Sequence, residues 1–312
     1  MKFASLVKNR KALVGLILFA ITCLLALFPG LFTTDHAPDV IGIYLPNLGP
    51  STAHLLGTTS YGQDIYSQLV YGTRQVLIIA LAAGGFATVL SVLIGITAAY
   101  MGGLVDEVLS LFTNVILILP AFPLMIILAR YAGTSNWVMI FVLVATGWSY
   151  GANQMRAQAL SLRNRDFLES ARVRGERRSY IILCEMMPTM TSLIVANFLG
   201  SALYSVLAAS GLQFIGLGNT SSDSWGTMLY WANSQEALQA GNSIWIIAPG
   251  LAIAVLSAAF ALMNYAFDEI GNPALRPVRR KDLRTARKAA RALAQQEQDA
   301  LKGAENVYAD AS

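Results

Sequence analysis

Six apolar runs dominate this sequence, and they approach or exceed the roughly 20 residues that a helix needs to cross a bilayer. The runs cover residues 12–32, 76–101, 108–128, 137–154, 189–212 and 244–267. Only 13% of the residues are charged and 55% are hydrophobic, whereas about a quarter of a soluble domain is charged. The runs therefore predict an all-α, polytopic membrane protein with six transmembrane helices.

The first run has a competing interpretation as a cleaved signal peptide, because a basic segment precedes it. It is longer than the 7–15 residues that are typical of a signal-peptide core. It also ends at Pro29-Gly30 without an Ala-x-Ala cleavage site. We therefore expect an anchoring helix.

Positive charge is concentrated in three places, which hold 20 of the 22 Lys and Arg residues. Four precede the first run, seven lie between Arg156 and Arg178, and nine lie in the tail 276–312, whereas segments 33–73 and 213–242 have none. Because Lys and Arg favour the cytoplasmic side, we expect loop 157–188 and both termini in the cytoplasm and those two segments outside. The tail is interpreted as a solvated helical appendage or as a surface that contacts a membrane or a partner.

The segment 157–188, here called the arginine-rich loop, separates the fourth and fifth runs. Its apolar residues Leu160, Phe167, Leu168 and Ala171 fall on one side of a helix. Gly175 permits a sharp turn, and Pro188 is suited to the first turn of a following helix. The loop therefore predicts a helix, a turn and a second helix.

Several chemistries have no residues to support them. No G-x-x-x-x-G-K-[ST] loop is present, so the phosphate cradle of a P-loop ATPase is missing. The centres of the runs hold no Asp, Glu or His, which ion-coupled transporters and intramembrane enzymes use. The two histidines, His36 and His54, lie outside the runs, and the two cysteines cannot form a zinc site. These absences point to a passive gate that a partner operates.

A family resemblance rests on two groups of residues. In the arginine-rich loop, Glu169, Ala171, Gly175 and Pro188 match the E-A-A-x-x-x-G and I-x-L-P signature, with Ser170, Glu185 and Met187 departing from it. The chain resembles permease subunits of bacterial ABC importers in this signature. Segments 54–64, 214–218 and 224–226 resemble elements of the peptide/nickel/opine branch, with Thr59 and Gln63 as departures.

The resemblance implies a type I ABC importer permease fold, of the dipeptide/oligopeptide C-type subunit, in a bacterial or archaeal cytoplasmic (inner) membrane. The cytoplasmic coupling helices would lie between spans four and five. It also implies a second homologous permease, one or two P-loop ATPase subunits and an external substrate-binding lipoprotein as partners. ATP and Mg would bind those ATPases, and we expect no cofactor, no metal and no nucleic acid on this chain.

The resemblance further assigns residues to sites. The ATPase-coupling residues would be Phe167, Leu168, Glu169, Ala171, Arg172, Gly175 and Pro188, with Phe167, Leu168 and Ala171 buried at the contact. The alternative is that the loop packs on its own helices. The binding-protein contact would include His54, Gly57, Asp64 and Trp225, although His54 and Asp64 also suit turn and capping roles.

Asn197, Tyr204 and Ser205 are candidates for the translocation path because polar residues are scarce in the fifth run, with packing as the alternative. The expected domains are a permease domain at 1–275 and a basic cytoplasmic tail at 276–312. The expected cargo is an oligopeptide or oligosaccharide, and segments 236–241 and 264–273 favour the latter. The rival classes are an ion-coupled secondary transporter and a non-transporting membrane assembly protein.

Overall fold

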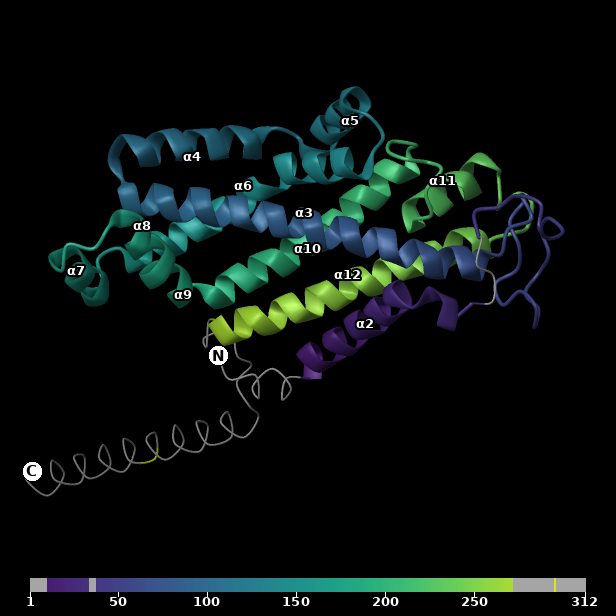
Figure 1. Ribbon diagram of the computed structural model, residues 1–312, viewed down its shortest axis with the longest axis horizontal. Helices are drawn as coiled ribbons and strands as arrows, with labels where there is room; N and C mark the ends of the chain where they lie inside the picture. The colour runs from purple at the N-terminus through teal and green to yellow at the C-terminus, as the bar shows by residue number, and fades with distance from the viewer. Residues whose placement is uncertain (1–9, 34–37, 272–294, 296–312) are drawn as a thin grey trace, which may run out of the picture. The chain divides into compact units, whose positions relative to one another are not determined.

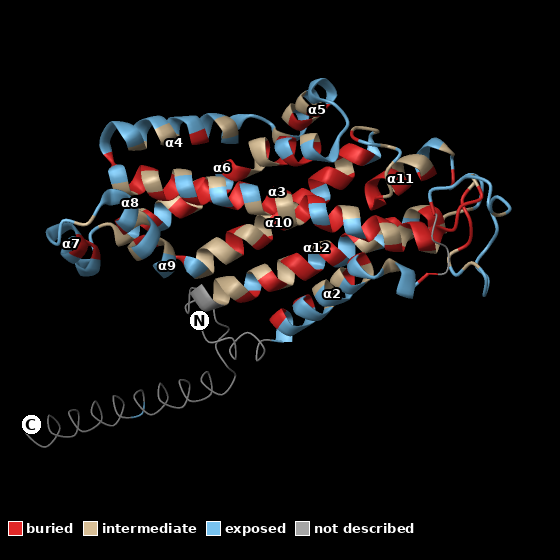
Figure 2. Cartoon of the chain, in the orientation of Figure 1, coloured by how far each residue is buried: buried red, intermediate tan, exposed pale blue. Residues whose placement is uncertain are grey.

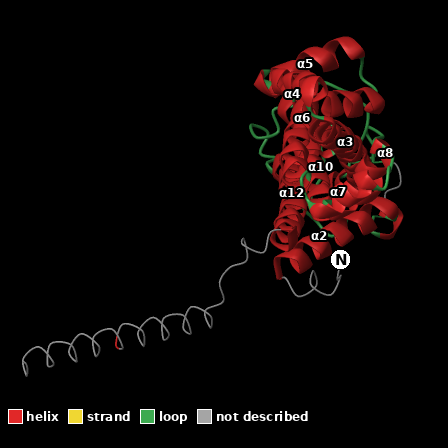
Figure 3. Ribbon diagram, turned by 90° about the vertical axis from the view of Figure 1, so that its left-hand side faces the viewer, coloured by secondary structure: helices red, strands yellow, loops and turns green. Residues whose placement is uncertain are grey.

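A computed structural model describes residues 10–33, 38–271 and 295, and helices make up its secondary structure with no strand in that part (Figure 3). The chain divides into two units, Met1–Gly271 and Asn272–Ser312. Apart from residue 295, the second unit lies outside the described residues. The predicted basic tail at 276–312 therefore stays a prediction.

Five long helices lie side by side in the first unit (Figure 1). They are α2 (Arg10–Leu27), α3 (Ile65–Met101), α6 (Asn136–Leu162), α10 (Thr191–Phe214) and α12 (Ile244–Gly271). A short 3-10 turn, η1 (Pro29–Leu31), follows α2. Helix α3 has 37 residues and packs against both α6 and α10.

Glycines on α3 allow the backbones of α10 and α6 to approach it closely. A Cβ added to Gly84 would lie 2.9 Å from the Cα of Ala202 on α10, and one added to Gly95 would overlap the carbonyl oxygen of Ala152 on α6. Small residues of this kind permit close helix packing in lipid. Helix α3 is therefore the axis on which α6 and α10 are assembled.

The prediction that the third span is a single helix is wrong. Residues 108–128 divide between α4 (Gly103–Ile118) and α5 (Ala121–Ala132), which are bent by 90° at the break. Leu119 and Pro120 have extended backbone, with ψ of 133° and 109°. Pro120 lacks an amide hydrogen and disfavours helical conformation in the residue before it, so the α4 helix ends there.

The predicted number of six spans is not confirmed. Within the described residues, four helices are long and apolar enough to cross a membrane, namely α2, α3, α10 and α12, and the bent pair α4–α5 makes five if it counts as one. Helix α6 is not among them, because its second half holds polar residues such as Asn153 and Gln154. The coarser prediction, an all-helical chain with several membrane-length helices, is confirmed.

The arginine-rich loop and the loops predicted to be external lie at opposite ends of the long helices (Figure 1). The first end holds α7 (Asp166–Val173), α8 (Arg178–Tyr180), the π-helix η2 (Ile181–Met186) and α9 (Met187–Thr189). The other end holds the loop 38–64 and α11 (Trp225–Ser234). Helix α3 connects the two ends.

Candidate functional site

The arginine-rich loop folds into the predicted helix, turn and second helical segment, but its helix is shorter than expected, because Leu160 belongs to α6 and α7 begins at Asp166. Helix α7 ends at Val173, and Gly175, which follows the capping residue, has a φ of +77°. The Glu176 amide donates to the Ala171 carbonyl, and the Gly175 amide donates to the Arg172 carbonyl. This is the Schellman arrangement that ends a helix at a left-handed glycine. The turn at Gly175 is therefore confirmed.

The inner face of α7 is buried by its own chain. Leu168 and Ala171 are both 0% exposed. They share an apolar cluster whose other buried members come from α3, α6 and the segment after the turn: Val92, Ile96, Ala99, Met155, Ala159, Ile181, Met186 and Met190. The structure thus corrects the expectation that Leu168 and Ala171 are buried against a partner, because their own helices already cover them.

Arg172 fastens α7 to the ends of the long helices. Its Nη2 donates to the backbone oxygen of Arg163, just beyond α6, at 2.8 Å. Its guanidinium carbon lies 5.5 Å from the centre of the Tyr100 ring on α3. A guanidinium over an aromatic face is attracted by the electron density of the ring. Arg172 therefore holds the loop in place within this chain.

The remaining apolar and acidic side chains of α7 are exposed and form what is here called its outer face. Val173 is 83% exposed and Phe167 is 38% exposed, and Glu169 is also exposed. Val173 was missed by the sequence analysis because it lies off the side of α7 on which Leu168 and Ala171 are buried. The sequence signal for this residue is an apolar side chain placed between two arginines, Arg172 and Arg174. The outer face therefore combines apolar and acidic side chains.

Pro188 lies in the short helix α9, directly after the π-helix η2, and helix α10 begins at Thr191. Proline has no amide hydrogen for the carbonyl four residues earlier, and its ring clashes with that carbonyl. The preceding turn is therefore wider, and the Met187 amide donates to the Ile182 carbonyl five residues earlier. Arg174 on the α7 side reaches Glu185 on the η2 side at 3.5 Å. The two arms of the loop are therefore joined.

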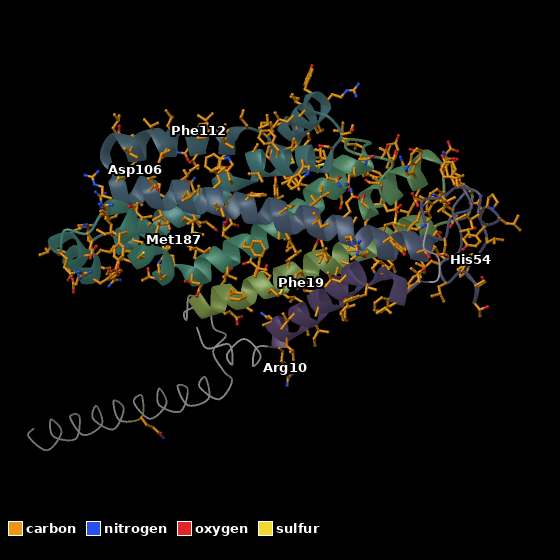
Figure 4. The ribbon with its side chains drawn as sticks, viewed as in Figure 1. Arg10, Phe19, His54, Asp106, Phe112 and Met187 are labelled. Carbon is orange, nitrogen blue, oxygen red and sulfur yellow. The ribbon has the colours of Figure 1, made fainter. Side chains whose placement is uncertain are left out.

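A second ion pair holds α4 against α6 near the same end (Figure 4). The Nε and Nη2 atoms of Arg156 donate to the two carboxylate oxygens of Asp106 at 2.6 and 2.7 Å. Ser110 also donates to Asp106. Paired bonds of this geometry are strong and directional. They attach the otherwise exposed start of α4, which Figure 2 shows mostly pale blue, to the long helices.

The residues predicted to contact a binding protein are covered by their own chain. Asp64 caps α3 by accepting from the Ser67 amide, and its other oxygen lies 2.8 Å from Nδ1 of His54, a residue labelled in Figure 4. A Cβ on Gly57 would overlap the carbonyl oxygen of Leu48. These contacts confirm the turn and capping alternative for His54 and Asp64.

Trp225, the fourth of these candidates, lies at the start of α11. It is 3% exposed, and its Nε1 donates to the Leu69 carbonyl on α3 at 2.9 Å. Its neighbour Ser224 forms a capping box with Thr227. Trp225 therefore attaches α11 to α3.

The three candidates for a translocation path lie within helix contacts. Asn197 is 7% exposed and Ser205 is 2% exposed, with the Ser205 hydroxyl bonded to the Ser201 carbonyl. A Cβ on Gly151 would overlap the Asn197 amide, and one on Gly147 would lie 3.1 Å from the Tyr204 ring. These positions favour the packing alternative for all three.

A cavity of about 380 Å³ lies at the end opposite to the arginine-rich loop. Asp39 and Asp223 line it together with Tyr61, Trp231 and Trp245. Burial, followed by the negative charge of Asp39, raises the pKa of Asp223 to about 6. No Lys or Arg of segments 33–73 or 213–242 is present to neutralise this pair. The cavity is therefore an acidic, aromatic-walled feature of this end.

Comparison with known proteins gives a consistent result. Residues 91–276 match the family described as binding-protein-dependent transport system inner membrane component. The chain is similar to the dipeptide transport system permease protein DppC of Alkalihalophilus pseudofirmus, at 28% identity over 84% of this chain and 85% of that protein. It is also similar to the oligopeptide transport system permease protein OppC of Mycobacterium bovis, at 30% identity over 58% of this chain and 63% of that protein.

Proposed function

The chain belongs to the family of binding-protein-dependent transport system inner membrane components, and from this premise we propose that it is the peptide-carrying permease subunit of an ATP-driven importer. A permease of this family is a membrane component and is not itself catalytic. ATP and Mg would bind to separate ATPase subunits. A second, related permease would complete the translocation path.

The observation that carries the coupling proposal is the division of α7 into two faces. Leu168 and Ala171 fix the helix to its own bundle, while Val173 and Phe167 are presented outward. A helix that is anchored on one side can transmit a push received on the other. We assign the outer face of α7, including Glu169, to the contact with an ATPase subunit. Arg172, Gly175 and Pro188 act indirectly by shaping and holding the loop.

The proposed orientation places the arginine-rich loop and both termini in the cytoplasm, because Lys and Arg gather there. Helix α6 is proposed as the sixth span, since its 27 residues exceed the length that a bilayer requires. The middle of α6 packs against α3, where the Ser91 hydroxyl donates to the Trp148 carbonyl at 2.6 Å. Asn197, Tyr204 and Ser205 support these helix contacts.

The binding protein is proposed to rest on the exposed tips of the outer loops. Apolar side chains stand out there, with Ile41, Leu45, Leu55 and Leu238 between 59% and 71% exposed. His54, Gly57, Asp64 and Trp225 shape and support this surface. Because these segments carry no Lys or Arg, a partner with a basic, partly apolar face is complementary to them.

Peptides are the proposed cargo because the two relatives described above carry the words dipeptide and oligopeptide in their names. The oligosaccharide preference drawn from segments 236–241 and 264–273 stays a prediction. Uptake of a labelled peptide set and a labelled oligosaccharide set by the same reconstituted importer distinguishes the two. Transport of the oligosaccharides alone would overturn the peptide assignment.

The coupling proposal is tested by Val173→Asp in the importer purified with its ATPase subunits. Placing a charge at an apolar contact is expected to lower ATPase-subunit retention at least about tenfold. The matched control is Ser161→Asp, which adds the same charge at an exposed position outside α7. Unchanged retention and uptake in Val173→Asp, with the protein inserted normally, would overturn the proposal.

A further inference from the structure

A hollow of about 680 Å³ lies between α7 and the adjoining ends of α3 and α6. Its polar lining comprises Tyr100, Arg163, Asn164, Arg172, Glu176 and Arg178. We call it the arginine hollow. It is separate from the outer face of α7, because it lies on the side where α7 meets its own bundle.

Two of the three guanidinium groups of the hollow bond to neutral partners, and the third lies beside a glycine. Arg172 donates to a backbone carbonyl and lies over Tyr100. Arg178 reaches the sulfur of Met101 at 3.7 Å, and Arg163 lies against Gly102. Across residues 10–33 and 38–271, none of the three has a carboxylate within 4 Å. Three positive charges therefore lie around one space without a close counter-ion.

The nearby carboxylates do not neutralise this charge. Glu176 lines the hollow, but it also pairs with Arg174 at 3.9 Å. Asp106 attracts Arg163 at longer range, and both of its oxygens are already bonded to Arg156. Three arginines against one glutamate leave a lining charge of +2. The missing component is an anion.

We infer that the arginine hollow binds the phosphate of an anionic phospholipid headgroup. The planar guanidinium fork matches phosphate oxygens, and basic pockets between membrane helices hold anionic headgroups. Met101, Leu160 and Ile181 supply an apolar part of the wall, which a lipid can contact and a free phosphate ion does not need. Helix α3, a membrane-length helix, ends at this hollow, as a headgroup site requires.

Native mass spectrometry of the full chain in neutral detergent tests the inference, with phosphatidylglycerol, phosphatidylcholine or inorganic phosphate added separately. We expect phosphatidylglycerol to be retained over phosphatidylcholine. Arg178→Gln should weaken this retention about fivefold, and Arg163→Gln with Arg178→Gln about thirtyfold. Because Arg178 makes a weak contact with Met101, its single substitution should leave the fold intact. This test is independent of ATPase docking.

The matched control is Arg177→Gln, which removes the same charge from the neighbouring exposed residue that does not line the hollow. Retention in this control should equal that of the unaltered chain. Equal weakening by Arg177→Gln and Arg178→Gln would reduce the effect to general surface charge and overturn the site. Saturable binding of inorganic phosphate without any preference for phosphatidylglycerol would overturn the lipid assignment.

Discussion

Leu168 and Phe167 are adjacent in the sequence, and the structure predicts opposite consequences for their truncation. Leu168 is fully buried in the cluster shared by α3, α6 and η2. Truncating a buried leucine to alanine costs about 2–5 kcal/mol. Helix α7 has eight residues, too few to be stable without packing. Leu168→Ala should therefore release α7 from the bundle.

Hydrogen exchange of the peptides that cover residues 166–175 measures this release. A loss of about 2 kcal/mol corresponds to about thirtyfold faster exchange, and Leu168→Ala should reach or exceed that value. Phe167→Ala should change exchange by about twofold or less, because the side chain is 38% exposed. In the assembled importer, Phe167→Ala should instead lower ATPase-subunit retention. The reasoning would be refuted if both variants lost protection equally, or if Leu168→Ala lost none.

Three further predictions concern other parts of the chain. A membrane-impermeant maleimide should label the exposed Cys184 in inside-out vesicles and not in spheroplasts, with Cys184→Ser as the control; the reverse pattern would contradict the proposed orientation. Because the folded-state pKa of Asp223 is about 6 rather than 3.8, the folded chain binds this proton more tightly than the unfolded chain, and thermal stability should fall as the pH rises from about 4 to about 6. Asp223→Asn should abolish that fall and add about 1–2 kcal/mol at pH 7 after allowance for solvent screening; an unchanged pH profile would count against it. In a double-mutant cycle by thermal unfolding, Asp106→Asn and Arg156→Gln should each cost about 1–3 kcal/mol, and the pair should cost less than their sum; strictly additive costs would show that the ion pair contributes nothing.

The turns of this fold could be predicted from the sequence where a glycine determined the backbone. The break at Gly102-Gly103 falls between the predicted runs 76–101 and 108–128, the turn at Gly175 lies where it was predicted, and all three glycines have positive φ. Such positions depend on local conformation alone. The helix, turn and helix of the arginine-rich loop follow from the same local information.

The break between α4 and α5 was missed for a physical reason. An apolar membrane segment looks continuous in composition, and the run 108–128 shows no polar interruption at Pro120. Whether proline bends a helix or ends it depends on whether neighbouring helices can bond the backbone groups that the proline leaves without a partner. Similarly, α3 starts at Ile65 rather than at residue 76, because Gln68 and Thr73 are buried by tertiary contacts.

The inner and outer faces of α7 could not be separated by periodicity either. The spacing of Phe167, Leu168 and Ala171 identifies an apolar side, but it does not tell whether that side packs on its own chain or on another. The structure shows that this side packs on its own chain, because η2 and the end of α3 lie against it. The same limit applies to Asn197 and Ser205, whose polarity did not reveal that neighbouring helices cover them.

The unbroken length of α3 has a mechanical consequence. Its 37 residues extend for about 55 Å, from the Asp64 cap to the arginine hollow. A stiff rod of that length converts a tilt of about 5° at one end into a displacement of about 5 Å at the other. The two ends of the bundle, where the solute and ATPase contacts are proposed, can thus move together through a single backbone.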